Sequence, residues 1–123
     1  MVTTEQKLVI VEAAIAYWEE RPDRWVKWTI GDSSTGMCLG GNITWHSRIV
    51  QPRYRDEIAQ AMLRDTRSAI ERLVSPACPI ISYYNDYVCQ SVTDALRPLY
   101  MIRDAYRTEL APVAVTPHEY HLV

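Results

Sequence analysis

Hydrophobic residues recur at helical spacing in three long stretches of this 123-residue chain. In the first stretch they are Leu8, Val11, Ile15 and Trp18. Steps of three and four residues place such side chains on one face of a helix, so the pattern predicts a helix over residues 4–20. Thr3 or Thr4 can accept the free backbone N–H groups at its start, and Pro22 marks its end.

The second and third stretches predict two more long helices. Within residues 53–74 the apolar positions are Ile58, Met62, Ala69 and Leu73. After Asn85-Asp86 they are Val88, Val92, Ala95, Leu96, Leu99, Ile102, Tyr106 and Leu110. Pro98 falls inside this last pattern. Because proline lacks an N–H and its ring meets the carbonyl four residues earlier, we expect a kink or break close to Leu96.

The connection after the first helix carries two tryptophans. Residues 21–37 are rich in glycine, serine and aspartate, which predicts a surface loop. Trp25 and Trp28 are three residues apart just before Gly31, a spacing that puts both indoles on one side of a short helical turn. We expect Trp28 to anchor the loop to the core, whereas Trp25 is open between an anchor and a contact for a partner.

Three shorter segments complete the chain. Residues 37–45 predict a short helix, in which the adjacent Gly40 and Gly41 permit another backbone to approach closely. Residues 80–84 predict extended chain packed on helices, because no second strand is evident for them to pair with. The tail over residues 111–123 is predicted to be irregular.

These elements define a mainly α fold. We expect a single compact helical domain over residues 1–123, with three long helices, a short one, and room for a short extended segment before the last helix. The composition, 48% hydrophobic and 23% charged, is typical of a globular protein and argues against disorder. A chain of this length buries roughly two-thirds of the surface that its unfolded state exposes, so it needs no disulfide to be stable.

Charge and cysteine content indicate the compartment and exclude some partners. The net charge of -2 gives no general electrostatic reason to bind nucleic acid or an anionic membrane. No stretch approaches the roughly 18 apolar residues of a membrane span. Cys38, Cys78 and Cys89 are odd in number and no apolar signal segment precedes the first helix, so we expect a reduced, cytoplasmic protein.

Cys38 is the one candidate nucleophile with a favourable position. Near the start of a helix its thiol would have a lowered pKa, as a thiolate nucleophile requires. The only histidines available as a general base are His46, His118 and His121, and Asn85 or Asp86 could orient one of them. A small cysteine beside two glycines is more often a packed core residue. A Cys38-dependent hydrolase or transferase, with His46 and Asp86 as candidate partners, is therefore an alternative, and no catalytic residue is assigned.

The remaining polar patterns have structural explanations. His118 and His121 are three apart, but no third or fourth ligand is visible, so we expect no metal and no cofactor. Asn85 or Asp86 can cap the last helix by accepting its free N–H groups. The outer face of residues 53–74 carries Arg55, Arg64, Arg67 and Arg72 among Asp56, Glu57, Asp65 and Glu71. Mixed signs predict a solvated face with weak ion pairs, and nucleic-acid binding through its arginines is the second alternative.

Three short motifs together resemble a known family. They are Trp28-x-x-Gly31, Cys38-Leu39-Gly40-Gly41 and Tyr84-Asn85-Asp86. The chain resembles an uncharacterised family of small proteins of actinobacteria and their phages, in which the pattern reads approximately Trp, Gly, Cys-x-x-Gly-Ala and Trp-Asn-Asp. The resemblance covers most of residues 8–107, with Tyr84 where tryptophan is usual. It implies an origin and a fold, and no activity. Eleven of the 13 basic residues are arginine, which agrees with a GC-rich host.

The leading hypothesis is a non-catalytic cytoplasmic accessory protein, encoded by a phage, that acts by binding a protein partner. That partner is a host protein or a second copy of the chain, which would make a homo-oligomer. The hypothesis depends on the small size, the full core and the absence of a convincing reactive constellation.

Overall fold

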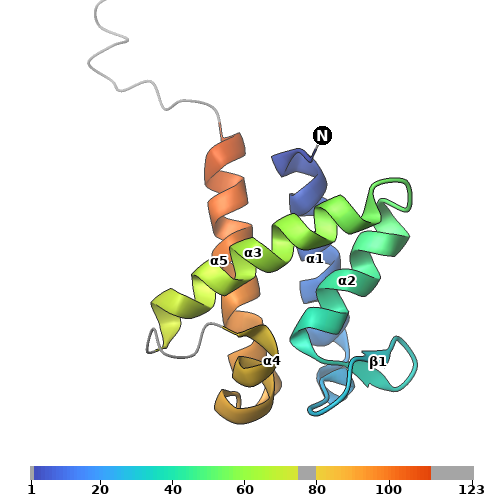
Figure 1. Ribbon diagram of the computed structural model, residues 1–123, viewed down its shortest axis with the longest axis vertical. Coiled ribbons are helices and arrows are strands. Elements are labelled where there is room, and N and C mark those ends of the chain that lie inside the picture. The colour runs from blue at the N-terminus through green and yellow to red at the C-terminus, as the bar shows by residue number, and fades with distance from the viewer. Residues whose placement is uncertain (1, 75–79, 112–123) are drawn as a thin grey trace, which may run out of the picture.

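The chain folds into helices joined by short connections, and the computed structural model describes residues 2–74 and 80–111 (Figure 1). The α-helices in these ranges are α1 (Thr4–Glu20), α2 (Leu39–Val50), α3 (Arg55–Leu73), α4 (Ile81–Tyr83) and α5 (Val92–Leu110). A 3-10 turn, η1 (Pro22–Arg24), follows α1, and a π-helical turn, η2 (Tyr84–Val88), follows α4. Between η1 and α2, strands β1 (Gly31–Asp32) and β2 (Gly36–Met37) pair antiparallel. The described chain is mainly helical, as the sequence predicts.

Helices α1 and α5 run antiparallel along the long axis of the molecule (Figure 1). Two contacts link their outer sides: Arg107 Nη2 lies 3.0 Å from Glu12 Oε2, and the Tyr100 hydroxyl donates to Glu19 at 2.8 Å. The buried side chains of the pair are Ile10, Val11, Ala14, Ile15 and Trp18 on α1 and Ala95, Leu96, Pro98, Leu99, Ile102 and Tyr106 on α5. The apolar faces expected from the spacing therefore lie in one core.

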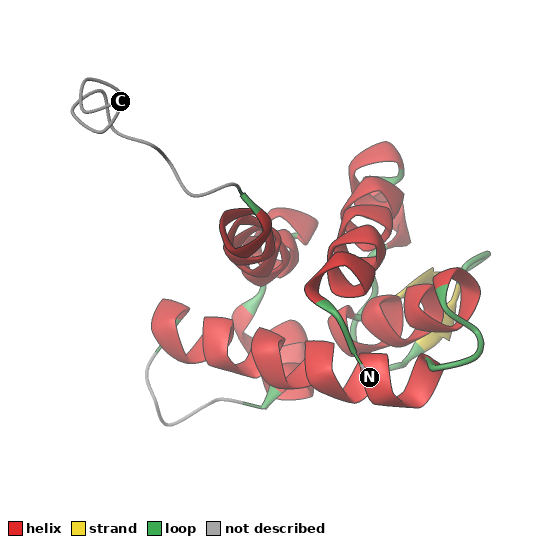
Figure 2. Cartoon of the chain, turned by 90° about the horizontal axis from the view of Figure 1, so that it is seen from above, coloured by secondary structure: helices red, strands yellow, loops and turns green. Residues whose placement is uncertain are grey.

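Helix α3 crosses α5 and packs against α2 (Figure 2). It adds the fully buried Ile58, Met62 and Ile70 to the core, and α2 adds Ile43. Because α2 leads into α3 through a short turn, the two helices form a hairpin that covers one side of the α1–α5 pair.

A part-buried polar network ties three of the helices together. Asp65 on α3 accepts hydrogen bonds from the Tyr106 hydroxyl of α5, at 2.6 Å, and from the Lys7 ammonium of α1, at 2.9 Å. The Lys7 nitrogen also lies 4.7 Å from the centroid of the Tyr106 ring. Burial raises the pKa of Tyr106, and its hydrogen bond to the Asp65 carboxylate raises the pKa further. The phenol therefore stays protonated and neutral.

The ends of α1 follow the sequence signals. Thr3 Oγ1 accepts from the Gln6 N–H at 3.1 Å, and the Gln6 side chain accepts from the Thr3 N–H at 2.9 Å, which is a reciprocal capping box. At the other end the helix stops after Glu20, and Pro22 begins η1. The expected cap and stop are both confirmed.

A kink or a break was expected near Leu96, and helix α5 runs through Pro98 without a break. Pro98 has no N–H to offer to the Asp94 carbonyl four residues earlier. The Tyr84 hydroxyl donates to that carbonyl instead, at 2.6 Å. A side chain from η2 thus satisfies the group that proline leaves free.

Of residues 80–84, expected to be extended, only Ile80 is extended, and residues 81–84 are helical. The Tyr84 N–H bonds to the carbonyl four residues back at 3.0 Å, and the Cys89 N–H bonds to the Tyr84 carbonyl at 2.9 Å, the longer step of a π turn. The chain becomes extended at Cys89 and Ser91 before α5 begins. Val88 matches the apolar spacing of α5 but lies outside it, so the pattern placed the start of the last helix too early.

Candidate functional site

A buried asparagine joins the loop before α2 to the π turn. Asn85 is fully buried, and its Oδ1 accepts from Trp25 Nε1 at 2.7 Å and from the Leu39 N–H at 3.0 Å. Its Nδ2 donates to the Val26 carbonyl at 3.0 Å and to Asp86 Oδ1 at 2.9 Å. We call this set of hydrogen bonds the Asn85 clamp. Both polar atoms of the amide are satisfied, so the clamp can hold a specific geometry inside the fold.

Asn85 caps a helix, but not the expected one. Leu39 is the first residue of α2, whose initial N–H groups lack partners within the helix. Asn85 accepts one of them. Helix α5 instead has Ser91 at its N-cap, without a side-chain cap bond. The sequence therefore predicts that Asn85 can cap a helix, and the fold decides which helix it caps.

Asp86 holds the backbone of Trp28 in an unusual conformation. The Trp28 N–H donates to Asp86 Oδ1 at 2.9 Å, and the φ of Trp28 is 69°, in the left-handed region that residues with a Cβ rarely adopt. The side chain is 64% exposed, so the expectation that Trp28 anchors the loop is wrong. The backbone at Trp25 is extended, so the two indoles diverge, and Trp25 is the anchor.

Trp28 lies against the exposed Tyr87, and Tyr87 in turn lies against the exposed Tyr83. The Tyr87 ring meets the Trp28 ring edge to face, with centroids 4.9 Å apart, and Tyr83 stacks on Tyr87 at 4.8 Å. Tyr87 is 66% exposed and Tyr83 is 41% exposed. We call Trp28, Tyr83 and Tyr87 the aromatic ridge. Exposed aromatic side chains grouped in this way are typical of a binding surface.

Cys38 occupies the N-cap of α2, but it is not activated there. Its Sγ accepts from the Gly41 N–H at 3.4 Å. Burial raises the pKa of the Cys38 thiol, and the negative charge of Asp86 also raises it. The expected lowering of this pKa is therefore wrong, because desolvation outweighs the favourable helix N-terminus.

Among the described residues, no histidine lies beside Cys38 to act as its general base. His46 lies eight residues further along α2, about 12 Å away along the helix axis. Its Nδ1 is 2.9 Å from the Asn42 carbonyl oxygen, and burial lowers its pKa. Asp86 is committed to the Trp28 N–H and to Asn85. Cys78, His118, His121 and the predicted tail beyond Ala111 lie outside the described residues.

Several glycines around the loop lie where a side chain would not fit. A Cβ on Gly41 would lie 2.5 Å from the Ile30 carbonyl oxygen, so the expected close approach occurs there. Gly31 has a φ of 75°, and a Cβ on it would collide with a carbonyl across the β1–β2 hairpin. A Cβ on Gly40 would meet only Ile81 Cγ2, at 3.8 Å. The space beside Gly40 belongs to a groove.

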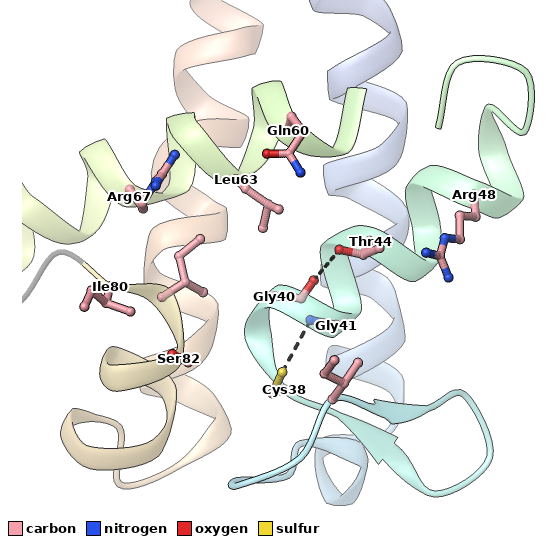
Figure 3. A pocket seen from close by; sticks show the side chains of 12 residues that line it. Cys38, Gly40, Gly41, Thr44, Arg48, Gln60, Leu63, Arg67, Ile80 and Ser82 are labelled. Atoms are coloured by element: carbon pink, nitrogen blue, oxygen red, sulfur yellow. Dashed lines mark hydrogen bonds between the residues drawn. The ribbon is translucent and has the colours of Figure 1, made fainter. Parts of the chain in front are cut away.

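This groove has a volume of about 500 Å³ and opens between α2 and α3 (Figure 3). It is lined by Gly40, Gly41, Thr44 and Arg48 of α2, by Gln60, Leu63 and Arg67 of α3, and by Ile30, Cys38, Ile80, Ile81 and Ser82. We call it the α2–α3 groove. Among its described lining residues two are arginines and none is acidic, although the chain as a whole has a net charge of -2. It is therefore a local concentration of positive charge.

The arginines of α3 lie on a solvated face. Arg64, Arg67 and Arg72 are exposed, as expected. Within the described ranges none of them forms an ion pair, whereas Asp65 on the same helix pairs with Lys7. The weak ion pairs expected on this face are thus not found for these three arginines, and Arg67 lines the α2–α3 groove. The side chain of Arg55 lies outside the described ones.

Among residues 2–74 and 80–111, no group of three or more His, Cys, Asp or Glu side chains could hold a metal ion. In the same part of the chain, no helix is both long and apolar enough to cross a membrane. Comparison with models of protein families, with curated proteins and with solved structures gave no match. A function is therefore inferred from the geometry of the aromatic ridge, the Asn85 clamp and the α2–α3 groove.

Sequence reasoning missed the aromatic ridge and the groove. Tyr83 and Tyr87 are four residues apart, a spacing that places them on one side of a helical turn. The prediction of extended chain over residues 80–84 concealed that signal. The groove depends on how α2 meets α3, and no local pattern reports this.

Proposed function

We propose that this protein is a non-catalytic cytoplasmic accessory protein, a single helical domain that binds a protein partner through the aromatic ridge. The observation that carries the proposal is the exposure of Trp28 and Tyr87, which are mostly outside the core. Tryptophan and tyrosine dominate the binding energy of protein interfaces, because they bury a large area with few rotatable bonds.

The backbone beneath the ridge supports this proposal. Asp86 bonds to the Trp28 N–H, and Asn85 bonds to the same loop two residues earlier. A ridge that is ordered before binding loses less conformational entropy when a partner arrives. The cost of the left-handed backbone at Trp28 is also consistent with a functional position, since such strain persists only where the surroundings impose it.

The surroundings of Cys38 favour binding over catalysis. A thiol with a raised pKa and no histidine beside it, within the described residues, is a poor nucleophile. On the resemblance of the Trp28, Cys38 and Asn85 motifs, we extend the proposal to a phage-encoded protein. Its partner is then a host protein or a second copy of the chain.

Three purified proteins test the proposal: the wild type, Trp28→Ala/Tyr87→Ala and the control Ile49→Ala, which removes an equally exposed side chain from α2. Each is immobilised and exposed to a lysate of an actinobacterial host, and light scattering measures self-association. We expect the wild type and Ile49→Ala to retain the same partner. After that partner is purified, its affinity for the ridge variant should be at least about tenfold weaker.

Two outcomes would overturn the proposal. One is a wild-type protein that remains a monomer in light scattering and retains no partner. The other is a partner whose measured affinity is the same for the ridge variant and the wild type. Circular dichroism establishes that the variants are folded before either comparison.

A further inference from the structure

The α2–α3 groove has the composition of a site for a small amphipathic molecule. Its volume of about 500 Å³ lies within the range of ligand pockets, roughly 300–1,000 Å³. Apolar side chains of Ile30, Leu63 and Ile81 line it, and Gly40 leaves space where any other residue would project a Cβ. An apolar lining with few polar groups favours the apolar part of a ligand.

The charged side chains among the described lining residues of the groove are both positive. Arg67 lies at one side of it and Arg48 at the other (Figure 3). Within the part of the chain that the structure describes, no acidic residue lines the groove and neither guanidinium forms an ion pair. Both cations therefore remain available to an anion from outside, although the net charge of the chain is negative.

We propose that the α2–α3 groove binds a medium-chain fatty acid. The acyl chain lies along the apolar lining beside Gly40, and the carboxylate pairs with the guanidinium of Arg48 or Arg67. Charge complementarity selects the carboxylate, because a planar guanidinium donates two parallel hydrogen bonds to it. This inference goes beyond the proposed function, since none of the three ridge side chains lines the groove.

Calorimetric titration with decanoate, below its micelle concentration, tests the proposal. Decanol supplies the same chain without charge, and acetate supplies the carboxylate without the chain. We expect saturable binding of decanoate with one molecule per chain, much weaker binding of decanol and none of acetate. Arg48→Gln/Arg67→Gln should weaken decanoate binding by about tenfold, because a hydrogen bond to a charged group is lost.

Two further variants separate the groove from the rest of the surface. Gly40→Leu should abolish decanoate binding because the new side chain fills the space beside Ile81. The backbone of Gly40 has an ordinary conformation, so the variant should fold. Arg64→Gln removes an exposed arginine of α3 that does not line the groove, so it should leave the affinity unchanged. The ridge variant Trp28→Ala/Tyr87→Ala should also bind decanoate normally, which makes the two proposals independent.

Three results would overturn the inference. They are the absence of saturable decanoate binding, decanol binding as tightly as decanoate, and an unchanged affinity in the double arginine variant. Sedimentation tests whether a second copy of the chain occupies the groove instead. A dimer that Gly40→Leu dissociates would assign the groove to that second copy. If Gly40→Leu does not fold, the arginine variants and the decanol comparison still decide the question.

Discussion

The α1–α5 pair and the Asn85 clamp stabilise the same chain in different ways. The helix pair buries rows of apolar side chains and leaves its charged groups, such as Arg107 and Glu12, at the surface. The clamp buries one amide that bonds to groups from two distant segments. Apolar burial tolerates small shifts because it is non-directional, whereas a hydrogen-bonded amide requires one geometry. We therefore expect mutations to be more severe and more local in effect at the clamp.

The largest effect is expected from Asn85→Ala. It would leave the Trp25 indole N–H and the Leu39 N–H without their acceptor, so we expect a loss of about 4 kcal/mol in the free energy of unfolding. Asn42 is the matched control, since it is also fully buried and, among the described residues, makes one side-chain hydrogen bond and has no partner for its Oδ1. Asn42→Ala should cost about 1–2 kcal/mol. Urea denaturation measures both, and equal losses would contradict a special role for the clamp.

Leu99→Ala is the corresponding test of the helix pair. Leu99 is fully buried on α5, so truncation should cost about 3 kcal/mol through lost burial and a residual cavity. The effect should spread over the core and leave the ridge intact. Amide NMR shifts of Trp28 and Tyr87 are the readout: they should move in Asn85→Ala and stay in place in Leu99→Ala. The reverse pattern would erase the distinction between the two regions.

Tyr84→Phe tests the link between the two regions. It removes the hydroxyl that donates to the Asp94 carbonyl, a group to which Pro98 has no N–H to donate. We therefore expect a loss of about 1–2 kcal/mol in the free energy of unfolding. In a Pro98→Ala background the new N–H can bond to that carbonyl, and the same change should cost clearly less. A double-mutant cycle measures this coupling. Additive costs would mean that the hydroxyl has no role in carrying α5 through proline.

Cys38 should react slowly with alkylating reagents near neutral pH. Its raised pKa lowers the thiolate fraction, so the rate should be several-fold below that of a free model thiol. Cys89, for which burial raises the pKa to about 12, should be slower still. Peptide mapping assigns the rates to individual cysteines. A Cys38 faster than the model thiol would restore the hydrolase or transferase alternative.

The smallest effect concerns the exposed turn between β1 and β2. Hydrogen bonds from Ser34 and Thr35 to Asp32 lower the pKa of its carboxyl to about 2. A lowered pKa contributes stability above the ordinary value of 3.8, and this contribution is lost as the pH falls through about 2. NMR titration of the Asp32 carboxyl measures the shift. Ser34→Ala should raise the pKa toward 3.8, and an unchanged value would show that the turn does not stabilise the carboxylate.

The long helices could be predicted from the sequence because the signals that form them are local. The spacing of Leu8, Val11 and Ile15, a Thr3 cap and a Pro22 stop are properties of neighbouring residues, and the structure has a helix there. The same reasoning went wrong at Val88, because an apolar residue at helical spacing does not reveal that the helix is interrupted. Periodicity reports the face of a helix better than its ends.

The candidate site was anticipated only as a set of residues. Trp28, Cys38, Asn85 and Asp86 were singled out, but Trp28 was placed inside, Cys38 was expected to be activated, and Asn85 was assigned to the wrong helix. Each error concerns burial or a partner that is distant in sequence. The exposure of a tryptophan and the pKa of a thiol depend on what the rest of the chain places around them.

The sequence by itself determined that this chain is mainly helical, where its first helix begins and ends, and which residues are chemically notable. Those properties follow from contacts between residues three or four apart. Only the tertiary structure decided that Asn85 caps α2, that Tyr84 satisfies the carbonyl freed by Pro98, and that the aromatic ridge faces solvent. The physical reason is that hydrogen bonds and burial between distant segments depend on how the helices pack, and local spacing carries no record of that packing.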